Sequence, residues 1–309
     1  MATAERKGLA INGWLVLDKP QGMSSSRAVG AVRRLIGAAK AGHGGTLDPL
    51  ATGVLPVALG EATKTVAWVM AGRKRYRFTL RWGEARDTDD AEGRLTGLSP
   101  ERPAAAAVAA ALPGFIGTIR QRPPDFSALK LAGRRAYDLA RGGETVELAP
   151  RPVDILELRL LGVPDPDHAE LEAVVGKGTY IRALARDLGQ ALGTLAHVTV
   201  LRRLQVGRFR AEDAISLDNL AALGHSAAAS GHLLPVETAL DDIPALALSE
   251  DEAHRLRCGQ AVTPLRPSDR ARIDQLGGGA TVRALTGGKL VAVAEIAAGS
   301  LRPVRVLNL

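Results

Sequence analysis

Cysteine and aromatic residues are scarce in this chain of 309 residues, and long apolar runs are absent. The single cysteine, Cys258, cannot form an intramolecular disulfide and excludes metal sites built from clustered thiolates. No segment approaches the roughly 20 consecutive apolar residues of a membrane-spanning helix, and residues 1–7 contain no apolar signal-peptide core. Aromatic residues make up only 3%, whereas Ala, Gly and Arg are abundant. We attribute this bias to the base composition of the genome and draw no structural conclusion from it. We therefore expect a cytoplasmic protein that is neither exported nor embedded in a membrane.

The composition is that of an ordinary folded protein whose positive charge is unevenly placed. Hydrophobic residues make up 46% and charged residues 24%, and the length suits two domains. The formal net charge is +7. Lys and Arg far outnumber Asp and Glu over residues 1–82, whereas the two signs nearly cancel over residues 83–309. A localised positive field favours a polyanionic partner such as a nucleic acid, although a merely solvated basic surface has the same composition.

The hydrophobic pattern predicts strands and helices that interleave irregularly. We expect strands around Trp14 and Val16, at 73–82, at 153–161 and at 169–175, and helices from the serines at 24–26 to Gly37, near 100–112, near 134–141 and from Thr179 to about Leu192. Because no regular βαβ period is present, a mixed α+β sheet is favoured over a doubly wound one.

A domain boundary is expected near residue 244. Residues 211–244 have the Ala-rich and Gly-rich composition of a connecting segment. Short strands follow at 281–285, 289–296 and 302–307. The prediction is a larger domain over 1–244 and a small β-rich domain over 245–309.

The strand at 73–82 alternates between apolar and mostly basic side chains. Tyr76, Phe78, Leu80 and Trp82 point one way, and Arg75, Arg77, Thr79 and Arg81 point the other. This alternation predicts a half-buried strand with a cationic face. Arg75 and Arg77 on that face are candidates for contacts with the phosphates of a polyanionic partner.

The densest run of unusual residues is 42–64, GHGGTLDPLATGVLPVALGEATK. Gly44 and Gly45 permit close backbone approach, and Pro49 restricts the residue before it to extended conformations. Asp48 is therefore held on a stiff loop, as a positioned nucleophile is. An aspartate that caps a turn through local hydrogen bonds fits the same pattern.

This run resembles the signature of the TruB family, the tRNA pseudouridine-55 synthases, in which the Asp of a GTLDP motif is the catalytic residue. Further family-like segments follow in family order: WLVLDKPQG at 14–22, residues 76–83, DTDDAEG at 87–93, QRPPDFSALKLAGRRAYDLAR at 121–141, KGTYIRALARDLG at 177–189 and residues 201–209. The resemblance implies a pseudouridine-synthase-type α+β fold, with a mixed or antiparallel sheet, flanking helices and a small PUA-like C-terminal domain.

The resemblance also implies an activity: isomerisation of the uridine at position 55, in the T-loop of tRNA, to pseudouridine, with Asp48 as the nucleophile. The reaction cuts the N-glycosidic bond, turns the base and joins its C5 to the same ribose. Because no net redox change occurs, neither a cofactor nor a metal is expected. The implied partner is tRNA, held by its T-loop and acceptor side, and the implied state is a monomer without a protein partner.

In the family, the residue that corresponds to Arg182 pairs with the catalytic aspartate, and an adjacent cation keeps a carboxylate ionised. The periodicity of the helix from Thr179 fits a solvated Arg182 equally well. Tyr76 is implied to stack on the target base, although its strand position alone is typical of a core aromatic residue.

The target base must leave its stack before it can reach a carboxylate. His43 corresponds to the family residue that fills the gap, whereas a lone histidine is more often structural or exposed. The other substrate-binding candidates are Lys19 and Pro20 at the pocket border, Gly44 and Gly45 in the loop, Lys64 and Lys130 as phosphate contacts, and Tyr180 and Leu201 as pocket lining.

Two other classes of protein compete with this hypothesis. A non-catalytic tRNA-binding or tRNA-folding module explains the basic first quarter, but it has no use for Asp48, Tyr76 and Arg182 together. A phosphate-binding enzyme built on residues 42–46 is disfavoured, because its glycines are followed by no Lys-Ser/Thr pair and lie in no strand–GxGxxG–helix context.

Overall fold

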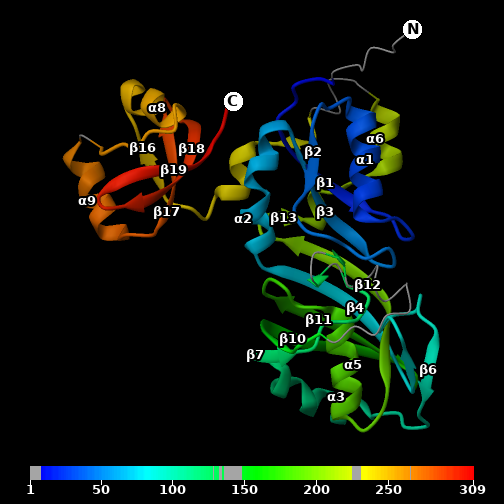
Figure 1. The fold of residues 1–309 in the computed structure, drawn as a ribbon. Coiled ribbons are helices and arrows are strands. Elements are labelled where there is room, and N and C mark those ends of the chain that lie inside the picture. Colours follow the sequence, from blue (N-terminus) through cyan, green and yellow to red (C-terminus); the bar gives the residue numbers. More distant parts are fainter. Residues whose placement is uncertain (1–7, 128, 132–133, 136–147, 225–230, 265) are drawn as a thin grey trace.

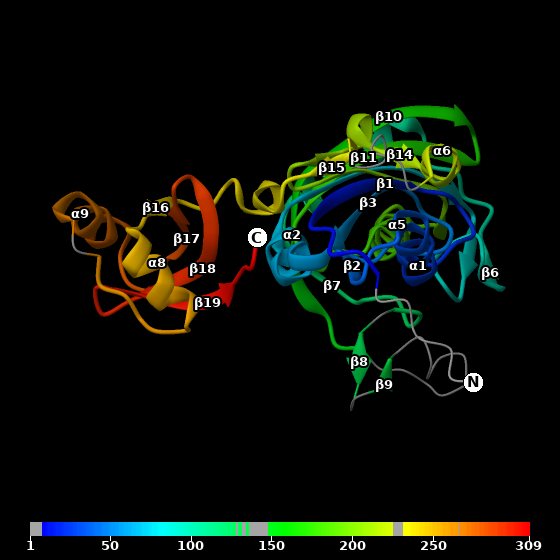
Figure 2. The same ribbon diagram turned by 90° about the horizontal axis from the view of Figure 1, so that it is seen from above.

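The computed structural model describes residues 8–127, 129–131, 134–135, 148–224, 231–264 and 266–309. A large curved sheet with helices on both faces occupies most of the molecule, and a smaller sheet with two helices lies to one side (Figures 1 and 2). No helix within these ranges has the length and apolar character needed to cross a membrane. The predicted α+β class is confirmed.

The large sheet has eleven strands in the described part of the chain. They are β1 (Gly13–Lys19), β2 (Ala41–His43), β3 (Thr52–Leu59), β4 (Lys74–Trp82), β7 (Gly117–Gln121), β10 (Arg151–Asp165), β11 (His168–Val175), β12 (Ala196–Val206), β13 (Phe209–Arg210), β14 (Ile215–Ser216) and β15 (Leu233–Leu234). The main order is β14-β1-β3-β12-β4-β11-β10-β7, with β2 on β3, β13 on β12 and β15 on β1. The β1–β14 and β12–β3 pairs are parallel, which makes the sheet mixed.

The helices divide between the two faces of this sheet. They are α1 (Ser25–Ile36), α2 (Val66–Ala71), α3 (Ala105–Ala111), α5 (Ile181–Ala191) and α6 (Leu217–Leu223), with single-turn helices η1 (Gly60–Thr65), η2 (Leu112–Phe115), η3 (Ala211–Asp213) and η4 (Val236–Leu240). Both α1 and α5 pack into one core with Leu15 and Leu17 of β1. Trp14 and Val16, which alternate with those leucines, enter a second core. Because successive strand residues face opposite ways, α1 and α5 cover the same face of the sheet.

The first predicted helix forms as its sequence indicates. Ser24 is the N-cap of α1, and its side chain accepts a hydrogen bond from the Arg27 N–H. Gly37 ends the helix in the left-handed conformation, at φ 74°. The predicted strands and the helix from Thr179 are likewise confirmed, with the ranges given above.

Three predicted segments differ from the structure. The helix expected near 100–112 begins only at Ala105 and continues as η2. Where a helix was expected near 134–141, Arg134–Arg135 form β9, which pairs with β8 (Lys130–Leu131), and residues 136–141 lie outside the described ranges. Residues 211–244 do more than connect, since β14 and β15 both pair with β1.

The C-terminal residues form the smaller sheet. Its strands are β16 (Ala245–Ala247), β17 (Thr281–Thr286), β18 (Lys289–Ala297) and β19 (Ser300–Val306), accompanied by α8 (Glu250–Arg257) and α9 (Pro267–Leu276); a separate hairpin joins β5 (Glu84–Arg86) to β6 (Leu95–Leu98). The three predicted strands are confirmed. The second core ties this sheet to the large one, because Leu290, Val293 and Leu307 enter it with Trp14. The division at residue 244 itself stays a prediction.

The arginines of the cationic face expected on β4 pair with acids of neighbouring strands. Arg75 Nη1 lies 2.6 Å from Glu172 Oε1, and Arg77 Nη2 lies 3.9 Å from Glu172 Oε2. Glu157 of β10 lies 3.7 Å from Arg75. Cross-strand pairs of opposite charge stabilise a sheet. We therefore no longer expect Arg75 and Arg77 to contact phosphates.

Candidate active site

Asp48 lies in the loop between β2 and β3, and a serine of α1 holds the residue before it. Ser25 Oγ accepts a hydrogen bond from Leu47 N (2.8 Å) and donates one to Leu47 O (2.9 Å). The Ala51 N–H donates to the Asp48 carbonyl at 3.1 Å, which closes a tight turn. Both bonds made by Ser25 are buried, so the backbone leading into Asp48 is fixed to the start of α1.

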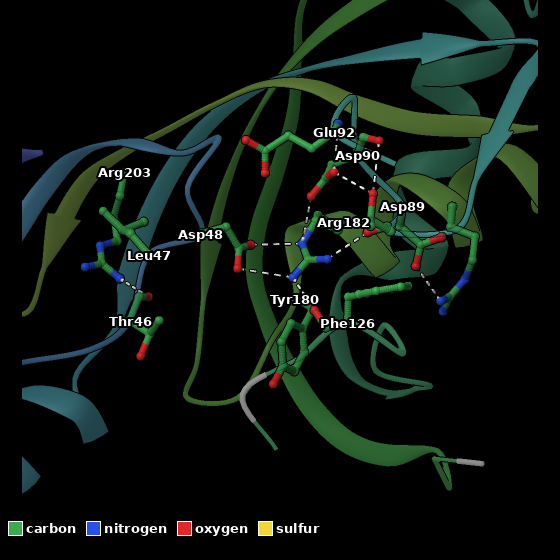
Figure 3. A network of polar contacts seen from close by, with 12 residues as sticks. Thr46, Leu47, Asp48, Asp89, Asp90, Glu92, Phe126, Tyr180, Arg182 and Arg203 are labelled. Carbon is green, nitrogen blue, oxygen red and sulfur yellow. Dashed lines mark hydrogen bonds and ion pairs between the residues drawn. The ribbon is translucent and has the colours of Figure 1, made fainter. Parts of the chain in front are cut away.

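A buried arginine holds the other side of this loop. Arg203 of β12 is 1% exposed. Its guanidinium donates to three backbone carbonyls, Val54 at 2.8 Å, Thr46 at 3.1 Å and Gly45 at 3.0 Å. Figure 3 shows the bond to Thr46. No carboxylate forms an ion pair with it in the described part of the chain. Arg203 therefore holds the loop that carries Asp48, and we call it the clamp on this loop.

The two glycines of the loop have structural reasons to be glycine. A Cβ at Gly44 would lie 2.5 Å from Val69 Cγ1, and Gly45 has φ +133°, where side chains are strained. These positions let the loop approach α2 closely. Their expected contacts with substrate stay a prediction.

Asp48 and Arg182 form a bidentate ion pair (Figure 3). Arg182 Nε donates to Asp48 Oδ2 at 2.9 Å, and Arg182 Nη2 donates to Asp48 Oδ1 at 3.2 Å. The Arg182 side chain is 4% exposed and that of Asp48 is 34% exposed. The predicted pair is thus confirmed, and the alternative of a solvated Arg182 is wrong. The carboxylate is thus partly open to solvent while its cation is buried, an arrangement that suits attack on a bound molecule.

Three further groups fix the Arg182 guanidinium. It donates to the carbonyls of Thr88 (2.7 Å) and Phe126 (2.9 Å), and Asp90 Oδ2 lies 3.5 Å from its Nε. Burial raises the pKa of Asp90, while hydrogen bonds from the Thr88 hydroxyl and the Glu92 N–H oppose that rise. Arg182 therefore lies between two carboxylates, of which only Asp48 is open to solvent.

Sequence reasoning did not assign a role to Asp90, Arg203 or Ser25. The acid-rich segment DTDDAEG and the segment 201–209 were recognised, but periodicity does not say which of their charged side chains turn inward. Ser25 was predicted only as one of the serines at the start of the first helix.

The chain is similar to known protein families and to named proteins along most of its length. A family model described as TruB family pseudouridylate synthase (N terminal domain) matches residues 33–181, and one described as tRNA pseudouridylate synthase B C-terminal domain matches residues 182–241. A protein of Rhodospirillum rubrum named tRNA pseudouridine synthase B is 55% identical, over 98% of this chain and 99% of its own length. A protein of the same name from Bradyrhizobium diazoefficiens is 56% identical, over 97% and 86%. The chain belongs to the TruB family of pseudouridylate synthases.

Solved structures agree with the TruB-family fold. The crystal structure of a Cbf5-Nop10-Gar1 complex matches with a TM-score of 0.72 at 25% identity, over 96% of this chain and 84% of that chain. The structure of an H/ACA RNP bound to a substrate RNA containing 2'-deoxyuridine matches with a TM-score of 0.73 at 22% identity, over 100% and 92%.

Lys19 and Pro20 lie beside the loop that carries Asp48, but only Lys19 is buried. The Lys19 ammonium is buried and donates to the carbonyls of Pro20, Met23 and Pro49, at 2.8, 2.7 and 3.4 Å. Burial lowers the pKa of Lys19 to about 8, although the Asp48 charge opposes this. Pro20 is exposed. Lys19 thus links the backbone at Pro49, next to Asp48, to that of residues 20–23, and it is not a mobile surface charge.

The aromatic and apolar candidates lie around the pair. Tyr76 of β4 is half-buried against the core that includes α5. Leu201 of β12 is buried opposite Phe78. Tyr180 directly precedes α5 beside Arg182 (Figure 3), and burial raises the pKa of its phenol. His43 ends β2, and burial, followed by the Arg203 charge, lowers its pKa. Its Nδ1 is buried without a hydrogen-bond partner in the described structure.

The two lysines expected to contact phosphates have different surroundings. Lys64 Nζ donates to Glu61 Oε2 (2.7 Å) and to the Val306 carbonyl (2.9 Å), so it helps to hold the C-terminal strand against η1. A phosphate contact would have to replace one of these partners. Lys130 lies in β8, and its side chain is outside the described part of the structure.

Asp89, next to Asp90, provides a test of the electrostatics at this site. It pairs with Arg186 Nη1 at 2.8 Å and has φ 58°. Burial raises its pKa from 3.8 to about 6, although Arg186 opposes the rise. Between these two values the folded protein binds more protons than the unfolded chain, so the free energy of unfolding falls as pH rises through the window.

The variant Asp89→Asn should remove this dependence, and Asn tolerates the left-handed backbone. Urea unfolding between pH 4 and pH 7 should show the wild type losing on the order of 2 kcal/mol relative to the variant. Parallel pH curves for the two proteins would contradict the assigned burial of this charge.

Proposed function

We propose that this protein converts the uridine at position 55, in the T-loop of tRNA, to pseudouridine, with Asp48 as the nucleophile. The observation that carries the proposal is the Asp48–Arg182 pair, an accessible carboxylate on a buried cation, in a chain of the TruB family. The relatives named tRNA pseudouridine synthase B support tRNA as the substrate.

The reaction rearranges bonds without changing the atom count. The bond between C1' of the ribose and N1 of uracil breaks, the base turns, and a bond forms between C1' and C5. C5 gives up its proton and N1 gains one. No oxidant or reductant takes part, and the residues of the site supply charge, position and proton transfer.

Asp48 starts the reaction as an anion, whether it attacks the sugar, attacks the base or removes a sugar proton. Arg182 binds both oxygens of the Asp48 carboxylate through two hydrogen bonds. Its other hydrogen bonds, to the Thr88 and Phe126 carbonyls, keep the guanidinium in place when the substrate binds. The carboxylate is therefore presented in one orientation, which is how a positioned nucleophile gains rate.

The target base reaches Asp48 only after leaving its stack, at a cost of a few kcal/mol. In the proposal Tyr76 covers the extruded base and takes part in removing the C5 proton, with Tyr180 and Leu201 lining the pocket. His43 fills the gap left in the RNA. The lowered pKa of His43 supports this role, because a neutral imidazole stacks between bases without a desolvation penalty for charge.

The proposal assigns the reaction to residues 1–244 and contact with the tRNA acceptor side to residues 245–309. The separate C-terminal sheet supports this division. The protein is proposed to act as a monomer in the cytoplasm, where tRNA is modified.

A synthetic T-arm hairpin tests the proposal. Tritium at C5 of its uridines should be released in the amount of one uridine per hairpin, and carbodiimide mapping should place the product at position 55. A hairpin with cytidine at that position should release none. Conversion at another uridine would refute the assigned position, and tight binding without conversion would favour the non-catalytic module.

A further inference from the structure

Of the eleven Lys and Arg residues that the structure describes over residues 8–82, six have side-chain partners within the protein. Those with partners are Lys19, Lys64 and Lys74, which donate to backbone carbonyls, and Arg75, Arg77 and Arg81, which pair with glutamates. The positive charge concentrated in residues 1–82 is therefore not a measure of the charge offered to a partner.

Five exposed cations of residues 8–82 have no hydrogen bond or ion pair from their side chains to described residues: Arg27, Arg33, Arg34, Lys40 and Arg73. Three of them belong to α1, and Lys40 follows it closely. The sequence of α1, SSRAVGAVRRLI, contains no acid. Free positive charge in this part of the chain is thus concentrated on one helix.

The arginines of α1 share its outward side. Its buried residues are Ser25, Ala28, Val29, Val32 and Ile36. Arg27 and Arg34 are seven residues apart, which places them on one stripe of the helix, about 10 Å apart along its axis. Gly30 lies between them, and a Cβ there would come within 3.6 Å of Arg34 Nη1. No acidic side chain of α1 interrupts this stripe, and Arg33 lies beside it.

This surface lies on the side of the molecule that carries Asp48. The core under α1 is the core under α5, so both helices cover one face of the large sheet (Figure 2). Ser25 joins the first residue of α1 to Leu47, next to Asp48. By contrast, the paired Arg75 and Arg77 belong to the opposite face, because they alternate with Phe78, which enters the core of α1 and α5.

The chemistry of the stripe selects a phosphate-bearing partner. Arginine presents a planar set of donors that matches phosphate oxygens, and three guanidiniums without internal acids are free to neutralise phosphates. None of the large exposed hydrophobic residues of the described chain belongs to α1. The stripe therefore offers nothing to an apolar protein surface or to the interior of a membrane.

We propose that the outward side of α1, formed by Arg27, Arg33 and Arg34, is a docking surface for backbone phosphates of the RNA whose uridine occupies the Asp48 site. This inference rests on the proposed function and extends it from the reacting nucleotide to the flanking backbone. Such contacts carry no sequence information but fix the register of the RNA on the protein.

The salt dependence of RNA binding tests this surface. We expect the double variant Arg27→Gln with Arg34→Gln to lower the slope of log Kd against log salt by about 1.5, since each phosphate contact contributes about 0.7–0.9. The matched control is Arg75→Gln with Arg77→Gln, which removes the same charge from the opposite face and should leave the slope unchanged. An unchanged slope for the α1 variant, or an equal drop for both, would overturn the proposal.

A charge-conserving variant guards against a folding artefact. Arg27→Lys with Arg34→Lys should keep most of the slope, and the melting temperatures of the two α1 variants should agree with that of the wild type, because the replaced side chains of α1 have no partner among the described residues. A loss of slope in the lysine variant would contradict the phosphate role. The wild type in the same assay separates the two proposals: without conversion of the T-arm hairpin the proposed function fails, whereas conversion with an unaffected slope defeats only the docking surface.

Discussion

Asp48→Asn is expected to reduce pseudouridine formation by at least about 10³-fold, while the Kd for the T-arm hairpin changes only a few-fold. The amide has the shape of the carboxylate but no charge, so it cannot act as the anion with which each route begins. The rest of the site should persist, because Arg182 keeps the Thr88 and Phe126 carbonyls and the Asp90 carboxylate. Single-turnover release of C5 tritium measures the loss of rate, and fluorescence anisotropy measures the affinity.

The fold supplies a matched control for this variant. Asp18 and Arg202 form another bidentate pair, at 3.0 and 2.9 Å, and the Asp18 side chain is 33% exposed, close to the 34% of Asp48. Asp18→Asn removes the same kind of interaction at a distance from Arg182. It should retain wild-type turnover. A similar loss of rate in both variants would show that the effect is structural, and retained turnover in Asp48→Asn would defeat the nucleophile assignment.

The loop that carries Asp48 was predictable because its causes are local. Glycine permits backbone angles that other residues avoid, proline restricts the residue before it, and the turn that these residues indicated is present. The burial of Arg182 was not visible in its own helix. Its position in the helix pattern put it on the polar side of α5, but the Thr88 and Phe126 carbonyls cover that side, from segments 94 and 56 residues away. Helical periodicity reports a polar face and says nothing about what covers it.

The same limit applies to β4. Alternation assigned Arg75 and Arg77 to one face of the strand, and they do share a face. The acids that neutralise them, Glu157 and Glu172, come from β10 and β11 and become neighbours only when the sheet assembles. A count of charges along the sequence therefore overstated the free positive charge on this face and did not reveal that α1 retains it.

Two helices beside the C-terminal sheet, α8 and α9, were not predicted. The sequence contains an N-terminal capping pattern for α8 but no clear helical pattern for α9. Ser249 and Glu252 form a capping box at the start of α8, the spacing that marks a helix N-terminus. Helix α9 begins with Pro267, a favoured first position, but only Ile273 among its residues is buried. Leu276, the last residue of α9, packs partly buried against the same core. Because both contacts lie near the end of the helix, α9 has no hydrophobic period long enough to detect in the sequence.

Arg203→Met is expected to lower kcat by about 10²-fold with little change in KM, and to lower the free energy of unfolding by about 2–4 kcal/mol. The apolar side chain fills the space but leaves the carbonyls of Gly45, Thr46 and Val54 without their donor. A buried carbonyl that loses its partner costs about 1–3 kcal/mol. The loop is then free to move, and displacement of a nucleophile by about 1 Å is enough for a loss of this size.

A variant of the neighbouring Arg202 distinguishes a loss of loop positioning from a general loss of stability. Arg202→Met removes the half-exposed pair with Asp18 and should change kcat by less than about two-fold when assayed well below its melting temperature. Arg203→Lys retains the charge but offers one ammonium to three carbonyls that lie in different directions, so its kcat should fall between those of the wild type and Arg203→Met. If Arg203→Met loses stability yet keeps its kcat, the clamp serves folding alone. If the kcat falls while RNA affinity is kept, the buried guanidinium determines where Asp48 stands when the base arrives.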